Sequence, residues 1–411
     1  MRRGAACASA LAVTILAAAC GSTTPAAVRH AATTTSAPPT TTTTTTLPSA
    51  VPTTVPTPVV AAVGWSAPLT TLPPVGGFTS VSCISDVFCL AAGGGSEEAD
   101  AADSSGPGVV GSWDGATWAT PVTYFPSPAG DNPPPWLPAI SCTDGPLCWV
   151  TDGSGHTSEG NGTTWSSPTP LAGVPVAPPD PSDPGPGHAG ARSAAVSCPT
   201  SAFCAYVDNT GHVAIWSGTA WSTPRAFTAP VGGSTVELYQ SGRVGVSCPD
   251  PSDCTALVGD AVLDWDGSTW TSSAGPWGSS VTGDSAVSCP SAGICVAVRG
   301  TSVSVRSPGS GWSSPRAIDG NGHLDSVSCR TLANCTAVDA YGDVVQFTGG
   351  SWSPPHKVVP TPVGYAGDGV TVSCPSAQFC MVLTGDGDYA TYQGASVASP
   401  TGATTAGPTA P

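Results

Sequence analysis

The stretch VSCPSAGICVAV, Val287–Val298, places two cysteines six positions apart, each beside a run of β-branched residues. Short β-branched runs joined by a turn are typical of a β-hairpin. Similar stretches recur six more times along the chain: VSCISDVFCLAA, ISCTDGPLCWVT, VSCPTSAFCAYV, VSCPDPSDCTAL, VSCRTLANCTAV and VSCPSAQFCMVL. Seven copies of one hairpin predict a repeat protein.

The repeating unit is longer than the cysteine hairpin. One clean copy, Asp325–Pro355, reads DSVSCRTLANCTAVDAYGDVVQFTGGSWSPP and divides into four strands, SVSC, CTAV, DVVQF and SWSP, joined by turn residues. The first cysteines of successive copies lie 59, 56, 50, 41, 40 and 45 residues apart. Four-stranded units at this spacing indicate a β-propeller. We therefore predict an all-β fold over residues 62–400, a seven-bladed β-propeller of four-stranded antiparallel blades.

The closure of the ring is also predictable. The sequence VGWSAP, Val63–Pro68, is a fourth strand without the first three before it, whereas the last unit ends in YQGASVASP, with Val397 where other units carry Trp. We infer that the N-terminal strand with Trp65 completes the blade begun at Cys374, which would remove the open edge. The tail around Val397 is the alternative for that place.

The composition limits the possible partners. Only 9% of the residues are charged, whereas Gly (50) and Pro (44) are abundant, which suits short strands and tight turns. The formal net charge of −16 argues against nucleic acid and anionic lipid headgroups as partners. The negative charge does not repel a cationic ligand, a divalent ion or a neutral polymer, so these remain possible partners.

The first residues are typical of an export signal. Arg2 and Arg3 precede the apolar run AACASALAVTILAAA, which is too short for an ordinary membrane span, so residues 1–19 are predicted to be a signal peptide. The run ends in LAAACGS, which resembles the lipobox of bacterial lipoproteins. The resemblance implies that Cys20 carries a lipid and that this lipid alone holds the protein on the outer face of the membrane. If Cys20 is not modified, the protein is secreted.

Two segments lack the residues needed for a core. Residues 20–61 would contain the lipid-attachment cysteine and a disordered Thr/Pro-rich tether, because the segment has almost no aromatic or charged residues. Such a tether, if extended as polyproline, reaches on the order of 100 Å. Residues 401–411 are predicted to be a disordered tail.

The cysteines form a consistent set. Of sixteen, Cys7 lies in the signal and Cys20 at the lipid position, and the remaining fourteen form seven C-x5-C pairs. In an exported chain this pattern predicts disulfides, namely Cys83–Cys89, Cys142–Cys148, Cys198–Cys204, Cys248–Cys254, Cys289–Cys295, Cys329–Cys335 and Cys374–Cys380. Zinc sites are a weaker alternative, since they favour C-x2-4-C pairs and more histidine. We predict no metal site and no cofactor.

One turn carries a family resemblance. The sequence SWDGATW, Ser112–Trp118, resembles the Asp-box turn of sialidase-type propellers, and the G-x-x-W-S-x-P strand resembles secreted bacterial propellers, including kelch-like repeats. The resemblance covers roughly residues 63–400. It implies the propeller fold and no activity, because the motif is structural.

Length variation singles out one face of the predicted disc. The C-x5-C turns and the short D-G or G-G turns share one face and are nearly uniform. The long connections, 93–108, 124–138, 169–192 and 231–243, all belong to the other face, which we call the variable-loop face. Varied loops on a rigid scaffold commonly carry binding. Candidate ligand-binding residues on this face are Tyr124, Phe125, Trp136, Tyr239, Trp277, His156, His212 and His323.

Each of these candidates also has a structural interpretation. The aromatic residues could instead pack between blades, and sequences such as DNTGH place Asp and Gly where hairpin turns require them. The sequence contains neither G-x-S-x-G nor H-E-x-x-H, and we name no catalytic residue.

These observations favour a monomeric, surface-tethered binding or scaffold module for a glycan, a cell-envelope polymer or a protein. A secreted glycoside hydrolase or lyase of the sialidase-like propeller type is the alternative, and a hydrolase would bring two carboxylates together near the channel mouth. A third possibility is an assembly factor for other exported proteins.

Overall fold

A computed structural model describes residues 64–70, 77–94, 107–125, 138–143, 145–153, 155–174, 193–227, 229–231, 234–236, 243–278, 284–320, 323–362 and 369–394. All of them belong to the second of two units, Met1–Val59 and Val60–Pro411. The predicted signal peptide, Cys20, the tether, the tail, Trp136 and Tyr239 lie outside the described residues, as do most of the four long connections. Within the described part, no helix is long and apolar enough to cross a membrane.

The described residues form seven antiparallel blades, which confirms the predicted fold class. Blade 1 contains β3 (Phe78–Ser85), β4 (Phe88–Gly94), β5 (Gly108–Trp113) and β6 (Val122–Phe125). Blade 2 contains β7 (Ala139–Cys142), β8 (Cys148–Thr151), β9 (His156–Gly160) and β10 (Thr169–Pro170). Blade 3 contains β11 (Ala194–Thr200), β12 (Phe203–Asp208), β13 (His212–Trp216) and β14 (Arg225–Ala226). A separate hairpin follows, with strands β15 (Ala229–Val231) and β16 (Ser234–Val236).

Blade 4 contains β17 (Gly245–Asp250), β18 (Asp253–Val258), β19 (Ala261–Trp265) and β20 (Trp270–Ala274). Blade 5 contains β21 (Ser285–Ser291), β22 (Ile294–Arg299), β23 (Ser302–Ser307), β24 (Gly311–Trp312) and β25 (Arg316–Ala317). Blade 6 contains β26 (Leu324–Thr331), β27 (Asn334–Asp339), β28 (Asp343–Thr348), β29 (Ser351–Trp352) and β30 (His356–Lys357). Blade 7 contains β31 (Val370–Ser376), β32 (Phe379–Thr384) and β33 (Asp388–Gln393), together with two N-terminal strands, β1 (Gly64–Trp65) and β2 (Leu69–Thr70).

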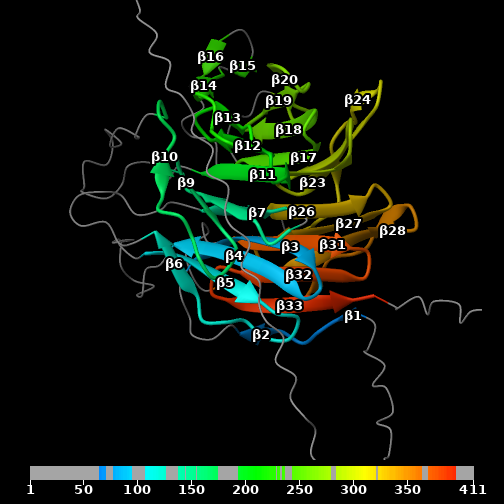
Figure 1. Cartoon of the computed structure of the whole chain (residues 1–411). Helices are drawn as coiled ribbons and strands as arrows, with labels where there is room; N and C mark the ends of the chain where they lie inside the picture. Colours follow the sequence, from blue (N-terminus) through cyan, green and yellow to red (C-terminus); the bar gives the residue numbers. More distant parts are fainter. Residues whose placement is uncertain are drawn as a thin grey trace, which may run out of the picture. The chain divides into compact units, whose positions relative to one another are not determined.

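The ring closes through the N-terminal strands, as predicted. Trp65 of β1 pairs with Tyr392 of β33, and Leu69 of β2 pairs with Tyr389 of the same strand. Figure 1 shows β1 and β2, at the blue end of the colour scale, beside the red β33. The alternative strand around Val397 lies outside the described residues. The N-terminal strand therefore covers an edge that would otherwise present unpaired backbone groups.

The W-S-x-P sequence explains why the fourth strand is split in blades 5, 6 and 7. In blade 6 the backbone N–H of Ser353 donates to the carbonyl of Gln346 (2.9 Å), and the Ser353 hydroxyl accepts from the backbone N–H of Gln346 (3.0 Å). The serine side chain thus takes the place of a backbone carbonyl where proline interrupts the ladder. The strand resumes at β30.

A second serine joins each blade to the next. In every copy of the repeat, the serine before the first cysteine accepts a hydrogen bond, at 2.9–3.0 Å, from the backbone N–H of the first cysteine in the following blade. The donor–acceptor pairs are Cys142–Ser82, Cys198–Ser141, Cys248–Ser197, Cys289–Ser247, Cys329–Ser288, Cys374–Ser328 and Cys83–Ser373. The seven bonds form a closed ring, which explains why serine as well as cysteine recurs.

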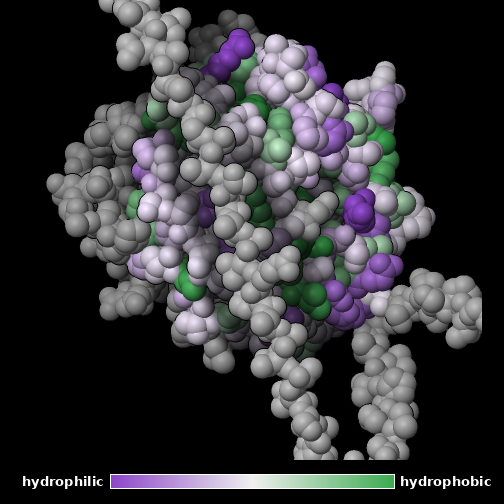
Figure 2. All heavy atoms as spheres, viewed as in Figure 1, coloured by the Kyte–Doolittle hydropathy of each residue, from purple (hydrophilic) through white to green (hydrophobic). Residues whose placement is uncertain are grey.

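The apolar core lies between neighbouring blades. Seven interfaces each bury a cluster of aliphatic residues and cysteines, joined in several of them by aromatic rings; for example, Val296 and Val298 of blade 5 pack with Val327 of blade 6. On the face shown in Figure 2, hydrophobic residues form small separate patches among polar ones. The seven predicted disulfides are all present, with Cα–Cα separations of 4.0–4.1 Å.

Candidate functional site

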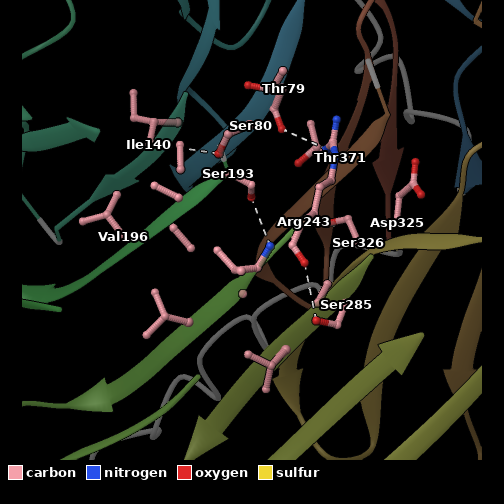
Figure 3. Close-up of a pocket in the computed structure, with 18 of the residues that line it drawn as sticks. Thr79, Ser80, Ile140, Ser193, Val196, Arg243, Ser285, Asp325, Ser326 and Thr371 are labelled. Carbon is pink, nitrogen blue, oxygen red and sulfur yellow. Dashed lines mark hydrogen bonds between the residues drawn. The ribbon is translucent and has the colours of Figure 1, made fainter. Parts of the chain in front are cut away.

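The first strands of all seven blades line a central channel. Each first strand follows an inter-blade connection, so all seven begin on the variable-loop face. They enclose a cavity of about 190 Å³, shown in Figure 3. The cavity wall consists of short apolar residues and hydroxyls, and its polar groups determine what it can bind.

Most of the wall hydroxyls are occupied by bonds between blades. Ser80 accepts the backbone N–H of Ile140 (3.1 Å), Ser193 accepts that of Val244 (3.1 Å), and Ser326 accepts that of Val372 (3.2 Å). Figure 3 draws the first of these bonds between its two labelled residues. These hydroxyls hold the ring together, which leaves the charged groups as the chemically distinctive part of the wall.

Arg243 is the one basic residue among the described residues that line this cavity. It precedes β17, and its backbone N–H donates to Oδ1 of Asp284 (2.6 Å). Its guanidinium Nη1 reaches from blade 4 to the carbonyl of Thr79 in blade 1 (3.5 Å). A Cβ added at Gly369 would collide with this guanidinium, and Gly369 has a φ of +48°. Glycine there leaves room for the arginine and suits the left-handed backbone.

Asp325 is the one carboxylate on the described part of the cavity wall. It is 8% exposed, and its Oδ2 accepts the backbone N–H of Val370 (3.1 Å). Burial raises the pKa of Asp325 to about 6, while the positive charge of Arg243 acts in the opposite direction. The charges of Asp284 and Asp339 also raise this pKa, so both carboxylates lie near Asp325, although neither lines the cavity.

Two predicted histidines are held by buried aspartates at hairpin turns. His156 Nδ1 lies 3.1 Å from Oδ2 of Asp152, and the hydrogen bond between them raises the pKa of His156 although burial lowers it. His212 Nδ1 lies 3.4 Å from Oδ2 of Asp208 and 2.7 Å from Oγ1 of Thr210.

The same aspartates also close the turns. Oδ1 of Asp152 accepts the backbone N–H of His156, and Oδ1 of Asp208 accepts that of His212. In the equivalent turn of blade 6, Oδ1 of Asp339 accepts the backbone N–H of Asp343 (2.7 Å), where Asp343 stands in place of the histidine. The structural interpretation of these Asp-Gly turns therefore holds. No group of His, Cys, Asp or Glu among the described residues is arranged to bind a metal ion.

The aromatic candidates are more buried than expected. Tyr124 is 5% exposed and packs in the interface between blades 1 and 2, which agrees with the structural interpretation of this residue. Burial, and to a lesser degree the charge of Asp152, raises the pKa of Tyr124 well above its ordinary value. Trp277 is half-buried against the interface between blades 4 and 5.

The structure brings three of the predicted residues together. The ring of Phe125 lies 5.2 Å from that of His156 and 6.5 Å from that of Tyr124. His212 in blade 3 and Trp277 after β20 belong to other parts of the ring. His323, exposed and with a φ of 81°, directly precedes β26 and stands two residues before Asp325. It is the predicted residue nearest in sequence to the channel-mouth charges.

Sequence reasoning did not select the three charged residues at the channel mouth. Arg243, Asp284 and Asp325 stand five, five and four residues before the first cysteine of their blades. The available signal was a charged residue four or five positions before the first cysteine in three successive blades. Since all first strands begin on one face, charged residues at or just before the start of the first strand in three successive blades lie near that face.

No family model matches the sequence, and no curated protein matches it. Solved structures do share its fold. It is similar to YCF48 from Cyanidioschyzon merolae, with 17% identity and a TM-score of 0.52 over 80% of this chain and 98% of that one. It is also similar to YCF48 bound to a D1 peptide, with 14% identity and a TM-score of 0.50 over 80% of this chain and 96% of that one. A third similar structure is a catalytically inactive virginiamycin B lyase from Staphylococcus aureus with quinupristin, with 7% identity and a TM-score of 0.56 over 80% of this chain and 99% of that one. At these identities the likeness shows the fold alone.

Proposed function

We propose that this protein is an exported, surface-tethered binding module that holds a polar ligand at the channel mouth on its variable-loop face. The observation that carries the proposal is the convergence of Arg243, Asp284 and Asp325, from blades 4, 5 and 6, at the start of their first strands. A guanidinium and carboxylates gathered in one place offer both donors and acceptors. Such a site suits a peptide segment or a glycan.

The remainder of the fold supports binding through this face. The opposite face carries the seven disulfide-closed turns, which keep one length throughout. Rigid blades that present connections of varied length are a common arrangement for recognition. A propeller of the same fold, YCF48, has been solved with a bound D1 peptide, which is a precedent for a peptide ligand.

The lipid anchor belongs to the same proposal. A lipid on Cys20 and a tether over 20–61 would hold the propeller on the outer face of the membrane, within reach of envelope polymers and other exported proteins. Mass spectrometry of the protein from its native membrane tests the anchor: a diacylated N-terminal Cys20 supports it, and an unmodified chain found in the medium contradicts it.

The binding function is tested by screening the purified protein against envelope glycans and against peptides from exported proteins. Any ligand found is then titrated with Arg243→Ala and with Arg316→Ala. Arg316 is a matched control because it is exposed on β25, outside the channel. We expect Arg243→Ala to weaken binding about tenfold or more and Arg316→Ala to leave it unchanged. Equal affinities for the two variants would place the ligand elsewhere.

A further inference from the structure

A second cavity lies between blades 2 and 3, away from the channel. It measures about 460 Å³, and its wall contains Trp149, Glu159, Trp216 and Trp221, together with hydroxyl residues of both blades. The three indoles contact one another, with ring centroids 4.7 Å apart for Trp149 and Trp216 and 5.3 Å apart for Trp149 and Trp221. The cavity therefore has an aromatic wall and a carboxylate beside it.

The carboxylate of Glu159 is unusual in its setting. Glu159 is half-buried and stands directly opposite Trp149 in the β8–β9 ladder, so both side chains face blade 3. Its backbone N–H donates to Oγ of Ser166 (2.9 Å). In the described part of the chain, no hydrogen bond or ion pair reaches its carboxylate. Burying a negative charge beside apolar rings costs more free energy when no positive charge lies next to it.

The interface between blades 4 and 5 shows what this position accepts. Asp264 stands opposite Thr255 in the β18–β19 ladder, as Glu159 stands opposite Trp149. There, Nη1 of Arg306 donates both to Oδ1 of Asp264 and to Oγ1 of Thr255 (3.0 Å).

The repeat makes the correspondence between the two interfaces direct. Arg306 stands opposite Cys295, the second cysteine of blade 5, and Trp216 stands opposite Cys204, the second cysteine of blade 3. At the interface of blades 2 and 3 the acid is therefore kept while its internal arginine is replaced by an indole. No described residue takes the place of Arg306 beside Glu159, which leaves that place for a cation supplied by a ligand.

We propose that this cavity binds an organic cation, an ammonium or guanidinium group, between the carboxylate of Glu159 and the indoles of Trp216 and Trp221. Cations are attracted both to a carboxylate and to the faces of indole rings. The formal net charge of −16 further favours a positively charged ligand. The cation comes either from a small molecule or from a lysine or arginine side chain of a protein partner.

The test is a titration of the full-length protein, followed by calorimetry and by the indole N–H signals in NMR spectra, with choline, with N-acetyl-arginine amide and with glucose as a neutral probe. We expect at least one cation to bind with a Kd on the order of 1 mM and glucose not to bind. Tighter binding of the arginine amide favours a protein side chain as the source, and tighter binding of choline favours a small molecule. Absence of binding by both cations overturns the proposal.

Variants locate the site. Glu159→Gln keeps the side-chain shape and removes the charge, so the affinity should fall about tenfold or more. The matched control Asp86→Asn removes an exposed carboxylate of blade 1 and should bind like the natural protein. Trp216→Arg rebuilds the arrangement of blades 4 and 5 and should abolish binding, with its thermal unfolding recorded to establish that it folds. Unchanged affinity in Glu159→Gln overturns the proposal.

This site and the channel mouth are separable. Arg243→Ala should leave the affinity for cations at the cavity between blades 2 and 3 unchanged. Glu159→Gln should leave the affinity for the channel-mouth ligand unchanged. Failure of one proposal therefore does not imply failure of the other.

Discussion

The hydroxyl of Ser373 in the last blade accepts a hydrogen bond from the backbone N–H of Cys83 in the first blade, at 2.9 Å, across 290 positions of sequence. It is the bond that closes the ring of seven Ser–Cys contacts. The N-terminal clasp joins the two ends of the propeller a second time, within blade 7, where Trp65 pairs with Tyr392. The two ends of the propeller are thus joined between the first strands of blades 1 and 7 and again at the outermost strand of blade 7.

Ser373→Ala should lower the free energy of unfolding by about 1–2 kcal/mol, because the N–H of Cys83 would lose its acceptor in a partly buried position. Denaturant unfolding at equilibrium measures the change. Ser314→Ala, at an exposed serine between the two halves of the split fourth strand of blade 5, is the control and should be neutral. Equal losses in the two variants would contradict a special role for the ring.

A chain that begins at residue 71 should unfold at a lower temperature and aggregate more readily than one that begins at residue 62. The shorter chain lacks β1 and β2, so β33 becomes an open edge strand that can pair with another molecule. Thermal unfolding and light scattering compare the two chains. Identical behaviour would show that the clasp does not stabilise the ring.

Replacing one disulfide, with Cys289→Ala and Cys295→Ala together, should reduce the free energy of unfolding by about 2 kcal/mol, the chain-entropy value for so short a loop. Reduction of the natural protein should have a larger effect, because it opens all seven bridges. If the reduced and oxidised proteins unfold at the same denaturant concentration, the bridges are not the structural staples inferred from the repeat.

Stability should depend on pH through Asp325. The folded-state pKa of Asp325, about 6, lies above the ordinary value of 3.8. Between about pH 4 and pH 6 the folded protein therefore keeps a proton on Asp325 that the unfolded chain has released. The contribution of this group therefore favours folding at low pH, declines as the pH rises from about 4 to 6, and is absent above that range. In Asp325→Asn this decline should disappear.

At pH 7 the same variant should be more stable than the natural protein by on the order of 2–3 kcal/mol, since an amide oxygen can still accept the N–H of Val370. Urea unfolding of both proteins between pH 4 and pH 8 measures the difference. Two parallel curves would show that Asp325 titrates normally.

Much of the fold could be predicted from local sequence. Four-strand periodicity, turn residues and cysteine pairing are short-range properties, so the number of blades, the disulfides and the strand order within each blade follow from reading one repeat seven times. Even the clasp could be inferred, because the unmatched strand around Trp65 needed a partner and the last blade lacked one. For Tyr124 the sequence left exposure and packing between blades as alternatives, since an aromatic residue next to a long connection can point either way, and the structure shows it buried.

The candidate sites depend on contacts between repeats, which local patterns do not specify. Arg243 approaches Thr79 from 164 positions away. That no described residue pairs with the Glu159 carboxylate becomes meaningful only when the interface of blades 2 and 3 is compared with that of blades 4 and 5. The sequence by itself determined the unit and how many times it repeats. Only the tertiary structure decided which side chains meet, because closure of the ring brings together the equivalent positions of blades far apart in the chain.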